Sequence, residues 1–76
     1  MSQVAPKGEA GFGTRLAQAR LRLGLTRKEL GARCGHSHVM IGRWETDANS
    51  PVLENVEPLA HALGVCAVWL AFGIGE

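Results

Sequence analysis

The sequence predicts an all-α domain built from five short helices. Apolar residues recur at steps of three and four along most of the chain, which is the spacing of one helix face. No segment alternates apolar and polar residues over more than four positions, as a half-buried strand does. The chain has 76 residues, of which 46% are hydrophobic and 20% charged, and this suits one small globular domain. We expect residues 1–11 to form a flexible tail and residues 12–76 to form the compact folded domain.

The first two predicted helices are recognisable by their ends. Gly24 ends the first, whose apolar stripe consists of Phe12, Leu16, Ala19 and Leu23. Thr26 and Glu29 open the second with the spacing of a capping box, in which each side chain accepts a hydrogen bond from the other residue's backbone N–H. Leu30 and Cys34 share one face of this short helix.

The third predicted helix follows a sharp turn. Ser37 is a favourable N-cap, because its hydroxyl can accept a hydrogen bond from the first helical turn. Ile41 and Trp44 are three residues apart, so both side chains point toward the core. The segment "DANSP" at residues 47–51 is rich in turn formers and predicts a loop.

The last two predicted helices have different patterns. The buried face of the fourth consists of Val56, Leu59, Ala60 and Leu63. Pro58 removes one backbone hydrogen bond, so we expect this helix either to begin late, with Asn55 as its cap, or to be kinked near Pro58. The fifth, "VCAVWLAFG", is short and apolar, with Trp69 in the core and Gly73 at its end.

Charge is distributed unevenly along the chain. The formal net charge is only +1, but all eight basic residues lie in residues 1–46 together with three acidic ones, which gives that segment +5. Residues 47–76 hold four acidic residues and no basic one, which gives −4. An asymmetry of this kind favours one face that meets a polyanion.

The second and third helices together have the spacing of a helix-turn-helix. Gly31 is small enough to lie where two steeply crossed helices approach closely. Gly35 supplies the left-handed backbone that a short turn requires. Leu30, Ile41 and Trp44 then hold the second helix of the pair against the first.

Five sequence fragments stand around these residues in a characteristic order. They are "LGLT-KEL" (23–30), "G-S---I-RWE" (35–45), "SP" (50–51), "LAHALGV" (59–65) and "WLAFG" (69–73). Each is weak alone, but the ordered set is specific. The stretch from about Phe12 to Gly73, some four-fifths of the chain, resembles the lambda-repressor/Cro-like, XRE-type family of DNA-binding domains. The resemblance implies a compact five-helix, lambda-repressor-like fold.

The chain departs from the family pattern at several positions. Arg27 stands where glutamine is usual, and Gly31 stands where alanine is commoner. An apolar residue is usual at His36, and Val52 replaces the usual Ser or Thr cap. Arg27 can hold a phosphate by its charge, whereas the usual glutamine contacts a phosphate and braces the third helix.

The resemblance implies sequence-specific binding of double-stranded DNA by a transcriptional regulator, which we expect to be a repressor. The recognition helix, at about residues 38–45, would lie in the major groove. With Ile41 and Trp44 facing the core, the residues expected to contact bases are His38, Val39, Met40, Gly42 and Arg43. Arg43 is the strongest candidate, because a bidentate arginine–guanine contact is the commonest specific one.

Phosphate contacts are expected on both flanks of this helix. The residues at these positions are Thr26, Arg27, Lys28, Thr46 and Asn49. Lys7 and Arg15 would add diffuse attraction. The resemblance also implies an ion pair between Arg20 and Glu45, partly buried, which fixes the first helix against the third rather than adding much net stability.

A domain with one short recognition helix reads about half a site. Similar proteins bind as twofold dimers to a near-palindromic operator, with half-sites about 34 Å apart. The expected dimer surface is the apolar C-terminal segment, with Val68, Leu70, Phe72 and Ile74. An alternative is that a further domain, outside this sequence, dimerises.

Three functions other than DNA binding are compatible with parts of the sequence. An enzyme would need a nucleophile with a base in reach, but Cys34 faces inward beside His36, so no catalytic residue is expected. Cys34, His36 and His38 offer three metal ligands where structural zinc uses four, so neither a metal nor a cofactor is expected. The serious alternative is an antitoxin-like, protein-binding module, whose partner would be a protein such as a toxin.

Cysteine usage and hydropathy bear on where the protein resides. Cys34 and Cys66 form no C-x-x-C motif and are expected to be reduced, buried and apolar in role. No apolar run reaches the roughly 18 residues of a membrane span, and the first residues lack the apolar core of a signal peptide. We expect a cytoplasmic protein with no membrane partner.

Overall fold

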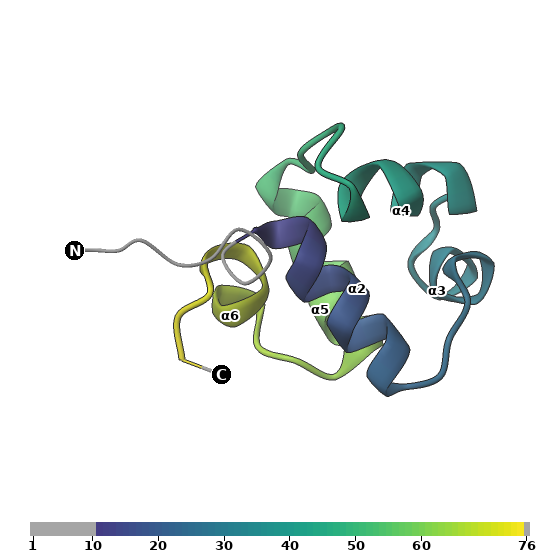
Figure 1. The fold of residues 1–76 in the computed structure, drawn as a ribbon. Coiled ribbons are helices and arrows are strands. Elements are labelled where there is room, and N and C mark those ends of the chain that lie inside the picture. Colours follow the sequence, from purple (N-terminus) through teal and green to yellow (C-terminus); the bar gives the residue numbers. More distant parts are fainter. Residues whose placement is uncertain (1–10, 76) are drawn as a thin grey trace.

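The computed structural model describes residues 11–75, which fold into five helices without a strand (Figure 1). The all-α prediction is confirmed. The helices are α2 (Phe12–Arg22), α3 (Arg27–Cys34), α4 (His38–Glu45), α5 (Leu53–Leu63) and α6 (Ala67–Phe72). The tail predicted at residues 1–11 lies outside the described residues except for Gly11.

Local hydrogen bonds set the ends of α3 and α4. The Glu29 N–H donates to Thr26 Oγ1 at 3.0 Å, and the Thr26 N–H donates to Glu29 Oε1 at 2.8 Å, which completes the predicted capping box. Gly35 ends α3 with φ +83°, a left-handed conformation that an L side chain rarely adopts. Ser37 Oγ then accepts the Met40 N–H at 3.1 Å and starts α4.

Helix α5 begins earlier than predicted. Its first residue is Leu53, and Val52 occupies the N-cap without a side-chain hydrogen bond. Asn55 lies inside the helix, where its N–H donates to the Val52 carbonyl oxygen at 2.9 Å. The late start was therefore wrong. The proline removes one hydrogen bond, but the buried face around Leu59 packs on the rest of the core and stabilises the helix.

A single core joins the five helices. Helix α2 packs on α4 and α6, α3 on α4 and α5, and α5 on α6 (Figure 1). The buried apolar residues are Leu16, Ala19, Leu25, Leu30, Ile41, Trp44, Val56, Leu59, Ala60, Leu63 and Leu70. Leu23, predicted on the first stripe, is exposed because it lies just past the end of α2 as its C-cap.

Helix α6 turns a different face to the core than predicted. Leu70, assigned from the sequence to the dimer surface, is fully buried, while Trp69 is only half-buried against the core. The inward residues Ala67, Leu70 and Ala71 follow steps of three and one, as one helix face does. Leu70 is therefore a core residue.

Arg15 anchors α6 to α2 and is buried. Its Nε donates to the Leu70 carbonyl oxygen and its Nη2 to the Ala71 carbonyl oxygen, both at 3.0 Å. These oxygens belong to the last turn of α6, whose carbonyls lack partners within the helix. Burial lowers the pKa of the Arg15 guanidinium, while the nearby Asp47 carboxylate acts in the opposite direction. Arg15 is thus a contact between α2 and α6, and its diffuse attraction of DNA stays a prediction.

The two cysteines lie in different surroundings, and both are free thiols. Cys34 is half-buried, its Sγ donates to the Leu30 carbonyl oxygen at 3.3 Å, and burial raises the pKa of the thiol. Cys66 is exposed at the N-cap of α6, so its predicted burial was wrong. Between residues 11 and 75, no helix is long and apolar enough to cross a bilayer.

Candidate nucleic-acid interface

Helices α3 and α4 form a compact helix-turn-helix. A Cβ added to Gly31 would overlap the carbonyl oxygen of His36, so the turn between the helices folds directly onto α3. The close approach expected at Gly31 is thus made with the turn. The His36 ring packs edge-on against Trp44, with ring centroids 4.8 Å apart. This contact holds the turn against α4.

Helix α4 has one buried and one exposed face. Ile41 and Trp44 are buried, at 0% and 3% exposure, as their spacing predicts. His38, Val39 and Arg43 are exposed on the other side. The two remaining residues expected to contact bases are less accessible, because Met40 and Gly42 are half-buried and Met40 packs against the core.

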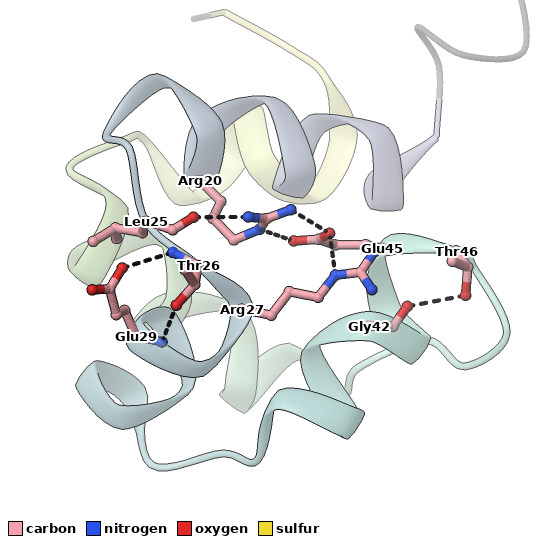
Figure 2. Close-up of polar contacts among 8 residues, drawn as sticks. All are labelled: Arg20, Leu25, Thr26, Arg27, Glu29, Gly42, Glu45 and Thr46. Atoms are coloured by element: carbon pink, nitrogen blue, oxygen red, sulfur yellow. Dashed lines mark hydrogen bonds and ion pairs between the residues drawn. The ribbon is translucent and has the colours of Figure 1, made fainter.

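A buried carboxylate at the end of α4 holds two arginines from other helices (Figure 2). Arg20 from α2 donates from Nε to Glu45 Oε2 at 2.6 Å and from Nη2 to Oε1 at 3.1 Å, so the ion pair implied by the resemblance is present. Arg20 also donates to the Leu25 carbonyl oxygen at 2.7 Å. The Glu45 side chain is only 2% exposed and that of Arg20 is 11% exposed.

Arg27 is the second arginine on this carboxylate. Its Nε donates to Glu45 Oε1 at 3.0 Å, and its side chain is 46% exposed. From the sequence, Arg27 was predicted to contact a phosphate, and its bond to Glu45 was not predicted. Arg27 and Glu45 nevertheless lie at helix ends that a helix-turn-helix brings together. Two guanidinium groups on one carboxylate leave a formal surplus of one positive charge. Of the two arginines, Arg27 is the one exposed to solvent.

The remaining predicted phosphate contacts lie at two helix ends. Thr26 and Lys28 are exposed at the start of α3, where backbone N–H groups favour an anion. Thr46 and Asn49 are exposed after α4. The Thr46 hydroxyl donates to the Gly42 carbonyl oxygen at 3.0 Å, so this side chain is held against the helix.

The loop after α4 is tied to the start of α2 through Gly13, a residue that the sequence analysis did not select. The Gly13 N–H donates to Asp47 Oδ1 at 3.1 Å. A Cβ on Gly13 would lie 2.6 Å from the Trp44 carbonyl oxygen and would overlap that of Glu45. The first turn of α2 therefore rests on the C-terminal carbonyls of α4. The only sequence signal was a glycine near the start of a predicted helix, where glycine is otherwise unfavourable.

Cys34 is the residue that the metal and nucleophile alternatives share. Among residues 11–75, no three side chains of His, Cys, Asp or Glu lie close enough to share a metal ion. The Cys34 thiol is directed to a carbonyl of its own helix, and burial disfavours its thiolate, which is the reactive form.

This geometry matches a known family. The family model that matches residues 16–70, most of the chain, is described as helix-turn-helix. The chain belongs to the helix-turn-helix family, of the XRE/lambda-repressor-like type. Members of this helix-turn-helix type bind DNA and regulate transcription, which supports the same broad role here and argues against an enzyme.

Three solved structures are similar to this chain in fold and in sequence. The P22 c2 repressor in complex with synthetic operator 9T is 32% identical with a TM-score of 0.76, over 79% of this chain and 91% of that one. The solution structure of the P22 c2 DNA-binding domain is 32% identical with a TM-score of 0.78, over 83% of each chain. The restriction-modification controller protein C.AhdI from Aeromonas hydrophila is 29% identical with a TM-score of 0.76, over 82% of this chain and 94% of that one. No curated protein sequence matches the chain.

Proposed function

We propose that this protein binds a specific double-stranded DNA operator and represses transcription, with α4 in the major groove. One observation carries the proposal: α4 is anchored from beneath by Ile41 and Trp44, while His38, Val39 and Arg43 project from its other face. A short helix held in this way matches the width of the major groove. The similarity to an operator-bound repressor supports the same use of the surface.

The exposed side chains suggest how bases would be read. Arg43 can donate two hydrogen bonds to guanine O6 and N7, and His38 can bond a base edge or a phosphate. Val39, 53% exposed, can contact a thymine methyl. Met40 would contribute only at the flank, because it packs partly against the core. Base selectivity should therefore depend on Arg43 more than on any other side chain.

The two helix ends beside α4 would hold the sugar–phosphate backbone. Thr26, Arg27 and Lys28 form one cluster at the start of α3, and Thr46 and Asn49 form the other after α4. Such contacts set the register of the protein on the duplex but do not read the sequence. Each neutralised phosphate adds about 0.9 to the magnitude of the log–log salt slope.

In-vitro selection from random duplexes at a stated salt concentration tests the proposal. We expect wild-type protein to enrich a near-palindromic motif. Arg43→Ala should relax it at one symmetric position, with about 1–3 kcal/mol of discrimination lost per contact. Arg33→Ala, which removes an exposed arginine from α3 and shares no partner with α4, is the control and should leave the motif intact. A motif unchanged by Arg43→Ala, or no enrichment at all, would contradict the proposal.

Dimerisation would bring two copies of α4 to the two halves of the operator. The apolar surface at the C-terminal end consists of Val68, Phe72 and Ile74, which are 48%, 63% and 64% exposed. Phe72 lines two apolar hollows, both of which are also lined by Val56 and Ala71. An exposed ring beside hollows can pack against its own symmetry mate, as a twofold interface requires. We place the dimer contact on this surface, without Leu70.

Phe72→Ser tests the dimer contact. We expect the variant to sediment as a monomer at concentrations where wild type is dimeric, and to bind a full operator about as weakly as a single half-site, because the second half-site no longer gains from linkage. Leu21→Ser is the matched control, since Leu21 is also 63% exposed but lies on α2. Equal dimer dissociation constants for Phe72→Ser and wild type would exclude this surface.

The same exposed surface also fits a protein partner, as in an antitoxin-like module that binds a toxin. The two roles separate by mutation. Changing Arg43 and Arg27 together to glutamine should abolish operator binding and leave partner binding at the C-terminal surface intact. Phe72→Ser should abolish partner binding at that surface and keep wild-type affinity for a single half-site. A toxin-neutralisation assay with both variants shows which role dominates.

A further inference from the structure

The side chain that Gly42 lacks leaves space for Arg27. A Cβ built on Gly42 would lie 3.3 Å from Arg27 Nη1, 3.7 Å from Cζ and 3.8 Å from Cδ. The guanidinium of Arg27, a residue of α3, thus lies across α4 in the space that a side chain at position 42 would occupy. Gly42 is half-buried, and Arg27 is the neighbour that a Cβ there would meet.

Glu45 fixes Arg27 in this place. It lies three residues after Gly42, on the same side of α4, and accepts a hydrogen bond from Arg27 Nε at 3.0 Å. Figure 2 shows the Arg27 side chain running from the start of α3 to Glu45, with Gly42 nearby. Because Arg20 grips the same carboxylate from the other side, the acceptor is itself immobilised.

The outer edge of Arg27 remains available to a ligand. Among residues 11–75, Arg27 makes one hydrogen bond, from Nε to Glu45. Its Nη1 and Nη2 groups donate to no atom of these residues. Glu45 is almost completely covered while Arg27 is nearly half exposed, and the three groups together carry a surplus positive charge. A planar donor pair with surplus charge suits a phosphate oxygen pair.

We propose that Gly42 is a positioning residue for DNA binding: its missing side chain lets Arg27 lie across α4, where Arg27 holds a DNA phosphate beside the recognition helix. The inference rests on the proposed function and concerns the same surface. It differs from the sequence-based expectation that Gly42 contacts the bases directly. In that case the size of residue 42 would matter whether or not Arg27 is present.

A double-mutant cycle between positions 42 and 27 separates these roles. Gly42→Gln fills the space with a good helix former, so we expect its melting temperature to stay near that of wild type, because the gain in helix propensity offsets the lost Arg27–Glu45 bond. We expect its affinity for the selected operator to fall about tenfold, as for loss of one charged hydrogen bond. Its salt slope should decrease by about 0.9, with base preference unchanged. Gly42→Ala, which requires Arg27 to shift by little, should lose less.

The Arg27→Gln background is decisive. There the phosphate contact is already lost, so adding Gly42→Gln should change affinity by less than about twofold, since the two changes remove one shared interaction. Arg33→Gln, which removes the same charge elsewhere on α3, is the control background, and in it Gly42→Gln should keep its full effect.

Several results would overturn the inference. They are an equal loss from Gly42→Gln in both the wild-type and Arg27→Gln backgrounds, or an altered base preference. The proposed function fails separately, if wild-type protein shows no selective duplex affinity. If wild type binds selectively and the cycle is additive, only the role of Gly42 is rejected.

Discussion

Glu45→Ala is expected to lower the free energy of unfolding by about 3–5 kcal/mol, the usual cost of breaking a buried ion pair from one side. Arg20, 11% exposed, would keep its charge and lose both of its bonds to the carboxylate. Arg27 would lose the hydrogen bond that holds it on α4. For a domain whose stability is about 5–15 kcal/mol, such a change leaves a substantial unfolded population.

Urea denaturation followed by circular dichroism measures this effect. Glu54→Ala is the control, because Glu54 is exposed on α5 and should change stability by less than about 0.5 kcal/mol. Glu45→Gln keeps one acceptor oxygen and replaces the other with an NH2 donor, so its loss of stability should lie between those of the other two variants. If Glu45→Ala unfolds at the same urea concentration as Glu54→Ala, the carboxylate does not hold the helices together.

Gly13→Ala is the second change with a large expected effect. The added methyl group would overlap the Glu45 carbonyl oxygen and lie 2.6 Å from that of Trp44 and 2.7 Å from Glu45 C. These are backbone atoms of the recognition helix and cannot rotate away. We expect a loss of about 1–3 kcal/mol, the usual range for overpacking, although alanine normally favours a helix.

The same substitution should also move α4 relative to α2, because relief of the overlap requires the two helices to separate. Thermal melting and operator affinity should therefore both decrease. Gln18→Ala, at an exposed position of the same helix, is the control and should leave both measurements near wild type. A Gly13→Ala protein as stable as wild type would show that α2 and α4 can adjust without cost.

Features that depend on neighbours in the chain were predictable from sequence. The capping box at Thr26, the left-handed Gly35 and the Ser37 cap each involve residues within one turn, so the sequence displays the whole interaction. The orientation of α4 was predictable for a similar reason. Ile41 and Trp44 stand in a helix whose other residues are mostly less apolar, and their three-residue spacing defines one side.

Features that depend on distant segments were not predictable. Helix α6 is apolar all round, so its pattern gave no contrast between Trp69 and Leu70, and packing against α2 and α5 decided which one is buried. In the sequence Arg15 does not differ from a surface cation, because its acceptors on α6 lie 55 and 56 positions away. Pro58 suggested either a late helix start or a kink by a local rule, and the tertiary packing of α5 overrides the late start.

The bonds from Arg15 to α6 have a consequence for how the protein is made. A helix of six residues does not persist alone in water, and the carbonyls at its end are satisfied by a side chain 55 and 56 positions earlier in the chain. During synthesis, that guanidinium leaves the ribosome long before its acceptors do. The domain is therefore completed only when α6 emerges, by a contact that closes a loop between residues 55 and 56 positions apart.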